Sequence, residues 1–134
     1  MKCLVLVALL YPAAALAGPY DQPYAIITSD TVPSADPLLR PVIVNRVDGE
    51  TVASASNNKA VAAPGSHKVT VDLPPRKGFR VSTQRTLELL ARPCMRYYVV
   101  AKLDTPVGQE WQPLVRSSEL IAECQKEFRS TETK

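Results

Sequence analysis

Residue types that carry chemistry are sparse in this 134-residue chain, which contains three cysteines and a single histidine. Cys3 lies in the apolar N-terminal segment, which leaves Cys94 and Cys124, and an even count of cysteines in an exported chain predicts a disulfide. A bridge between them closes a loop of about 31 residues, worth roughly 3 to 4 kcal/mol in the chain-entropy model. Redox-active cysteines are typically two residues apart, unlike this pair. We therefore predict that Cys94 and Cys124 form a structural disulfide.

His67 lacks the neighbours that a catalytic or metal-binding histidine needs. A Ser-His-acid site requires a serine beside the imidazole, and the sequence has no Gly-x-Ser-x-Gly turn. A zinc site requires paired ligands at short spacing, such as Cys-x2-Cys, and the sequence has none. His67 lies in a predicted turn before a strand, where a histidine is typically exposed and idle. The sequence therefore predicts no catalytic residue, no metal site and no cofactor.

Aromatic and basic residues in the second half of the chain form a candidate binding patch. If the segment around Tyr97 and Tyr98 is a strand, the two rings point to opposite faces of a sheet. An exposed Tyr98 near Arg96 and Trp111 is a plausible recognition surface, because aromatic residues and arginine dominate interface hot spots. Cross-strand packing of the same side chains is the alternative interpretation.

Glu110 beside Trp111 has the residue types of a sugar-binding cleft, in which a carboxylate acts next to an aromatic ring. A tryptophan between polar residues in a β protein more often contributes half-buried packing. A small sugar-active hydrolase built on Glu110, Trp111 and His67 is therefore a less favoured alternative.

Residues Met1 to Ala17 have the pattern of a secretory signal peptide. Residues 3–10 form its apolar stretch, and Ala15–Ala17 have the small-x-small pattern of a cleavage site. The apolar stretch is too short, and too quickly broken by Pro12, to span a bilayer. We expect a mature chain that begins at Gly18 and is periplasmic or secreted, where disulfides persist.

Charge and hydropathy restrict the classes of partner. The formal net charge is +3, and the basic residues are spread along the chain and interleaved with acidic ones, which indicates solubility rather than a nucleic-acid partner. The densest basic group follows the Pro74-Pro75 turn and comprises Arg76, Lys77, Arg80 and Arg85. A solvated loop is the favoured interpretation. A rigid inhibitory loop from Pro74 to Arg80 would instead make the chain a secreted enzyme inhibitor. No second apolar stretch is long enough to span a membrane.

The elements that position these residues indicate an all-β fold. Residues 18–40 are rich in proline and predict an extended arm, with a short edge strand at 24–27. Residues 41–128 alternate short apolar segments with turn residues, which is typical of a β-sandwich of about six to seven short strands. Residues 129–134 are a polar tail.

Individual segments of this sandwich are predicted from turn chemistry and alternation. Asp48-Gly49 predicts a hairpin turn, and Pro64-Gly65 fits a type II turn. Residues 83–91 are compatible with a helix, but the alternation favours a strand. For residues 118–124 a strand and a helical turn remain open. The other predicted strands are 41–47, 68–73, 95–103 and 111–115, the last at an edge or bulge because of Pro113. The candidate core residues are Leu87, Leu89, Tyr97, Val99, Trp111 and Leu114.

The order Val47-Asp48-Gly49, followed by Pro64-Gly-Ser-His-Lys-Val-Thr-Val71, resembles the PEGA-like modules of bacterial surface proteins. The segment from Cys94 through Trp111 to Cys124 extends beyond that pattern and is similar to small exported bacterial proteins of unknown function. The resemblance implies a small sandwich with an accessory or interaction role. We therefore expect an exported, non-enzymatic binding or assembly module of the bacterial cell envelope with a protein partner.

Overall fold

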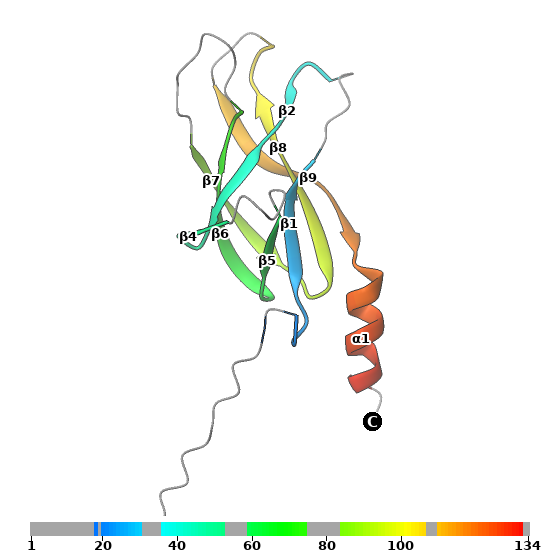
Figure 1. The fold of residues 1–134 in the computed structure, drawn as a ribbon. Coiled ribbons are helices and arrows are strands. Elements are labelled where there is room, and N and C mark those ends of the chain that lie inside the picture. Colours follow the sequence, from blue (N-terminus) through cyan, green and yellow to red (C-terminus); the bar gives the residue numbers. More distant parts are fainter. Residues whose placement is uncertain are drawn as a thin grey trace, which may run out of the picture.

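The computed structural model describes most of the chain beyond its N-terminal segment. The described residues are 18, 20–30, 36–52, 59–74, 84–106 and 110–132. They form two sheets that pack face to face, followed by one helix (Figure 1). The predicted signal peptide, most of the loop from Pro74 to Arg80 and the last two residues of the polar tail lie outside the described residues.

The two sheets confirm a small all-β domain. The central strand of the first sheet is β8 (Met95–Leu103), and β9 (Trp111–Leu120) pairs along one of its edges. β1 (Ala25–Ser29) and β2 (Leu39–Pro41) pair with successive parts of its other edge, and β5 (Ala60–Ala62) pairs with the far side of β1. The second sheet has the order β4 (Glu50–Thr51), β3 (Ile43–Val47), β6 (Gly65–Asp72) and β7 (Arg85–Ala91). The described residues contain nine strands rather than six to seven, because β2, β4 and β5 have only two or three residues each.

The core lies between the inner faces of the two sheets. The alternation predicted for residues 68–73 is confirmed, since Val69 and Val71 of β6 have 0% exposure. Each such side chain contributes about 1.5 to 3 kcal/mol by leaving water. Four of the six candidate core residues are buried, namely Leu89, Tyr97, Val99 and Trp111. Leu87 and Leu114 are half-buried, and Leu87 packs against the core from its margin.

The strand predicted near the start of the arm is interior rather than at an edge. β1 pairs in parallel with β8 on one side and antiparallel with β5 on the other. Ala25 and Ile27 are fully buried, so the apolar side chains of β1 fill the core. The edge prediction from proline content was wrong because Pro23 precedes the paired residues and interrupts no pairing. β2 also belongs to the first sheet, although it overlaps the predicted arm.

Two predicted turns adopt backbone angles that explain their residues. Asp48 (φ 52°) and Gly49 (φ 84°) both have positive φ, as the type I′ hairpin turn between β3 and β4 requires. Gly65 has φ 131° directly after Pro64, where the chain leaves β5 of the first sheet and enters β6 of the second. His67 therefore lies in β6, two residues beyond the turn predicted for it.

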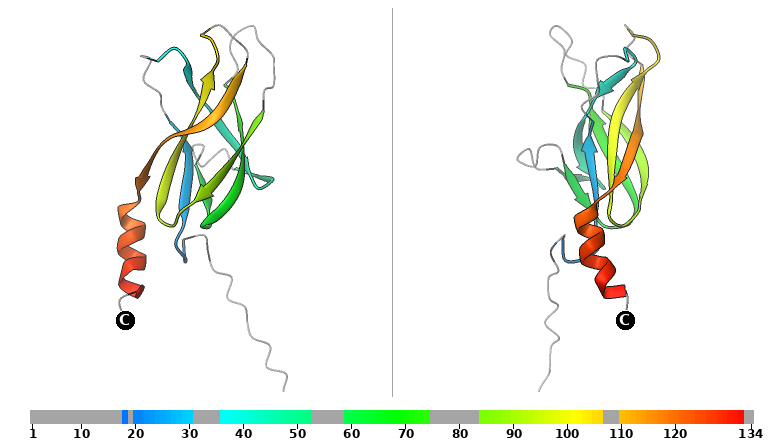
Figure 2. Two further views of the ribbon diagram at one scale, coloured as in Figure 1. Left: turned by 180° about the vertical axis from the view of Figure 1, so that it is seen from behind. Right: turned by 90° about the vertical axis from the view of Figure 1, so that its right-hand side faces the viewer.

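The C-terminal segment resolves the alternatives left open for residues 118–124. β9 continues to Leu120, and helix α1 (Ala122–Glu132) begins two residues later. Figure 2 shows α1 continuing from β9 beyond the end of the sandwich. The part of the chain that the structure describes contains no helix with the length and apolarity that a membrane span requires.

The predicted disulfide between Cys94 and Cys124 is confirmed, with 5.3 Å between the two Cα atoms. Cys94 lies in the turn between β7 and β8, and Cys124 lies in the first turn of α1. The two cysteines form a small second core with Tyr24 and Ile121. Within it, the Cys94 N–H donates to the Tyr24 carbonyl (2.7 Å), and the Ile121 N–H donates to the Cys94 carbonyl (2.8 Å). The bridge thus joins the β7–β8 turn to α1, and the Tyr24 contacts hold the start of β1 at the same place.

Reduction of this disulfide is expected to lower the free energy of unfolding by about 3 to 4 kcal/mol, because the unfolded chain loses a constraint over 30 residues of sequence separation. Urea unfolding with and without dithiothreitol measures the change. The Cys94→Ser/Cys124→Ser variant is the control. Its free energy of unfolding should equal that of the reduced protein and should not change when dithiothreitol is added. A loss below about 1 kcal/mol would contradict the structural role of the bridge.

Candidate functional site

Two of the three residues of the predicted binding patch lie together on the outer face of the first sheet. Arg96 and Tyr98 of β8 both contact Glu119 of β9. The Arg96 guanidinium donates to Glu119 Oε1 (2.8 Å), and the Tyr98 hydroxyl donates to the same oxygen (2.6 Å). The hydrogen bond between Tyr98 and Glu119 is the main reason why the pKa of Tyr98 is raised and that of Glu119 is lowered. These contacts hold the three side chains against one another, although Arg96 Nε is buried without a hydrogen-bond partner among the described residues.

Trp111, the third predicted patch residue, is in the core and not on that surface. Its side chain is 2% exposed and shares the inner face with Leu103, its cross-strand partner. The Arg85 guanidinium lies over the indole, 5.8 Å from the ring centre. The predicted patch of Arg96, Tyr98 and Trp111 therefore does not assemble.

A β-bulge explains why Trp111 and Glu119 point to opposite faces although both have odd numbers. The register between β8 and β9 shifts after Val115, which leaves Arg116 without a partner opposite it. An extra residue reverses the alternation of side chains beyond it. Trp111 and Val115 therefore face the core, and Glu119 faces outward. The sequence contained the signal of an irregular strand in Pro113, but the position of the bulge depends on the pairing.

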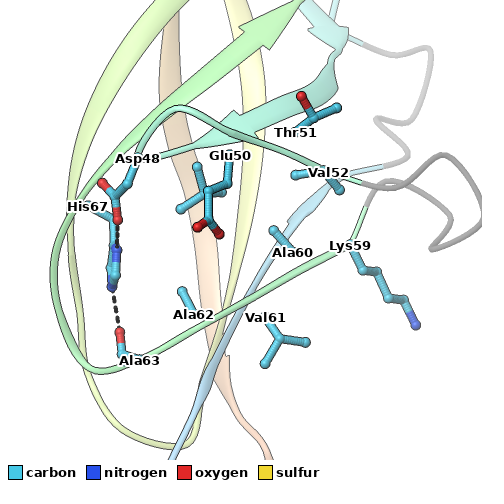
Figure 3. A pocket seen from close by; sticks show the side chains of 11 residues that line it. Asp48, Glu50, Thr51, Val52, Lys59, Ala60, Val61, Ala62, Ala63 and His67 are labelled. Carbon is cyan, nitrogen blue, oxygen red and sulfur yellow. Dashed lines mark hydrogen bonds and ion pairs between the residues drawn. The ribbon is translucent and has the colours of Figure 1, made fainter. Parts of the chain in front are cut away.

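A pocket of about 490 Å³ lies between the β3–β4 hairpin and β5. Its walls are hairpin residues between 47 and 52, residues 59–63 and the side chain of His67 (Figure 3). We call this pocket the β4–β5 groove. β4 is an edge strand of the second sheet and β5 is an edge strand of the first. The groove therefore opens between one edge of each sheet.

His67 connects the two walls of this groove, as Figure 3 shows. Its Nδ1 is 2.5 Å from Asp48 Oδ2 in the hairpin turn, and its Nε2 is 2.5 Å from the Ala63 carbonyl after β5. Both partners are acceptors, so both ring nitrogens donate only when the imidazole is protonated. The Lys68 N–H also donates to Asp48 Oδ1 (2.8 Å). We call the contacts among His67, Asp48 and Ala63 the His67 clip.

The electrostatics of the clip favour its charged form. Burial is the largest influence on the His67 pKa and opposes protonation. The hydrogen bonds to Asp48 and Ala63, with the charge of Asp48, outweigh burial and raise the pKa of His67 above its ordinary value of 6.5. The pKa of Asp48 is lowered from 3.8, first by the hydrogen bond from the Lys68 N–H and then by the bond from His67.

This arrangement suits a structural contact better than proton transfer. With both ring nitrogens donating, the imidazolium of His67 has no nitrogen free to accept a proton. The proposed hydrolase residues are also apart. His67 pairs with Leu89 on β7, whereas Arg85, which covers Trp111, pairs with Val71, four residues and about 13 Å further along β6. His67 and Trp111 therefore do not share a site.

Among the described ranges, no three histidine, cysteine or carboxylate side chains come together in a way that could hold a metal ion. Comparisons with models of protein families, with curated proteins and with solved structures gave no match.

Trp111→Ala is expected to lower the free energy of unfolding by about 3 to 5 kcal/mol, because it leaves a cavity in the core. The matched control is Leu120→Ala on the same strand, whose side chain is 58% exposed and whose loss should cost less than about 0.5 kcal/mol. Chemical unfolding followed by circular dichroism measures both variants. A Trp111→Ala protein as stable as the parent would favour a surface role for the indole.

The His67 clip predicts a pH dependence of stability. A raised histidine pKa contributes stability that is complete below pH 6.5 and is lost as the pH rises through the higher folded value. The lowered pKa of Asp48 contributes stability above pH 3.8 that is lost as the pH falls through its folded value. The clip should therefore stabilise the protein most between these two values.

Asp48→Asn tests this dependence, because asparagine tolerates positive φ but removes the charge. We expect the parent to lose stability as the pH rises above 6.5 through the raised pKa of His67, and Asp48→Asn to lose less over the same range. His67→Ala should cost about 1 kcal/mol at the lower pH, a small value because Asp48 is 50% exposed and solvent screens the pair. Thermal unfolding across this range provides the measurement. Identical pH profiles for the parent and both variants would contradict the clip.

Proposed function

We propose that the chain is an exported, non-enzymatic binding or assembly module of the bacterial cell envelope that recognises a protein partner. The observation that carries this proposal is the β4–β5 groove, an open pocket of about 490 Å³ whose histidine is fully engaged in hydrogen bonds. Pockets of this size are sufficient for specific recognition.

The disulfide supports the exported location. Disulfides persist in oxidising compartments and are rare in the cytosol, and this one joins the turn before β8 to the first turn of α1. Its buried surroundings of Tyr24 and Ile121 favour a structural bridge over a redox-active one. Export therefore agrees with the signal peptide expected at residues 1–17.

Recognition rather than turnover is supported by the chemistry of the groove. Its ionisable residues are Asp48, Glu50, Lys59 and His67. Asp48 and His67 bind each other, which leaves Glu50 and Lys59 as charges without a hydrogen-bond or ion-pair partner among the described residues. A lone carboxylate and a lone ammonium on opposite walls suit the binding of a partner with charges of both signs.

Affinity capture from envelope extract with the mature, disulfide-intact protein tests the proposal, with bound proteins identified by mass spectrometry. We expect one partner to be recovered in a reproducible and stoichiometric amount. The control is the same protein unfolded by reduction and alkylation, which should retain nothing specific. The recovery of no protein partner, together with turnover of a substrate in an activity screen, would overturn the proposal.

A further inference from the structure

One wall of the β4–β5 groove is formed by β5, whose outer edge is free. β5 pairs with β1 through Ala60, Val61 and Ala62, and within the described residues it has no strand on its other side. Such an edge presents unpaired N–H and C=O groups at the spacing of a strand. The backbone of another extended chain has N–H and C=O groups at the same spacing and can therefore form hydrogen bonds with this edge.

The side chains beside this edge leave space for a backbone. Ala60 and Ala62 face inward and are small, and Ala63, Val47 and Val52 complete an apolar lining. The Ala63 carbonyl is already bonded to His67, so the pairing edge ends there. The available edge therefore corresponds to a short strand, with apolar side chains of small to medium size directed into the groove.

The charged side chains at the groove indicate which charge the bound segment should carry. Figure 3 shows the Glu50 side chain directed from the hairpin toward β5, while Lys59 lies at the start of β5 on the opposite wall. Neither side chain has a hydrogen-bond or ion-pair partner within the described part of the chain. A cationic side chain on the incoming strand would pair with Glu50 close to the main-chain contacts.

We propose that the β4–β5 groove binds an extended segment of a partner protein by strand addition to β5, with a lysine or arginine of that segment against Glu50. This inference rests on the proposed function, since it names the partner's chemistry and the site. Main-chain pairing supplies affinity in this mode of recognition, and the flanking side chains supply specificity.

The test uses a capped eight-residue peptide in which valine alternates with threonine and one central position is lysine. Two-dimensional NMR of the mature protein should show binding, with the amide shifts of Ala60, Val61 and Ala62 changing most. A second peptide carries N-methyl groups at alternate residues, which removes its edge donors, and its affinity should fall by about tenfold or more.

Charge reversal provides the matched variants. Glu50 is exposed and lies in a hairpin, so we expect the Glu50→Lys variant to fold. It should bind the lysine peptide about tenfold more weakly than the parent does. The same variant should prefer a peptide with glutamate at the central position. Glu110→Lys makes the same change at an exposed residue that does not line the groove, and it should bind like the parent.

Several outcomes would overturn the inference. Equal binding of the N-methylated peptide would exclude main-chain pairing, and an unchanged affinity of Glu50→Lys would exclude the charge contact. A dimer of the chain that Glu50→Lys dissociates would identify a second copy as the occupant. If none of the peptides binds while the captured envelope protein still binds Glu50→Lys, the groove is wrong and the proposed function stands.

Discussion

The contacts around the Cys94–Cys124 bridge hold the ends of the fold together. Cys94 lies in a turn with φ 59°, and its N–H and carbonyl bind Tyr24 before β1 and Ile121 after β9. The disulfide adds helix α1 to the same point. Segments far apart in sequence therefore meet at one end of the sandwich, and few buried apolar residues besides the bridge hold them there. In a domain of this size a single cross-link is a large part of net stability.

The bulge at Arg116 divides β9 into two parts with different roles. Before the bulge, Trp111 and Val115 pack in the core. Beyond it, Glu119 accepts hydrogen bonds from Arg96 and Tyr98 on the outer face. Arg116 itself binds Asp30, which follows β1 (3.0 Å). One inserted residue therefore turns the odd-numbered side chains of β9 from the inner to the outer face without ending its pairing with β8, because the pairing continues on both sides of the bulge.

At the other side of the sandwich, the two sheets are joined by side chains instead of strands. The His67 clip links the hairpin of the second sheet to the end of β5 in the first. It also positions the walls of the β4–β5 groove, since Asp48 and Ala63 belong to opposite walls. A change in the charge of His67 alters one of these two contacts, so the shape of the groove and the ionisation of its histidine are physically linked.

Local patterns in the sequence determined much of the fold. Alternation identified β6 and β7, aromatic and β-branched residues identified β8, Asp48-Gly49 identified the hairpin turn, and Cys94 with Cys124 identified the bridge. Each of these features depends on residues close in sequence or on residue chemistry alone. The rest depended on pairing between distant segments. The prolines near β1 suggested an edge strand, although β1 is interior. The odd numbers of Trp111 and Glu119 could not show that the two side chains face opposite sides of the sheet, because that depends on the bulge. No local pattern connected His67 to Asp48, nineteen residues away. The groove likewise exists only because β4 and β5 end their sheets on the same side, which tertiary packing alone decides.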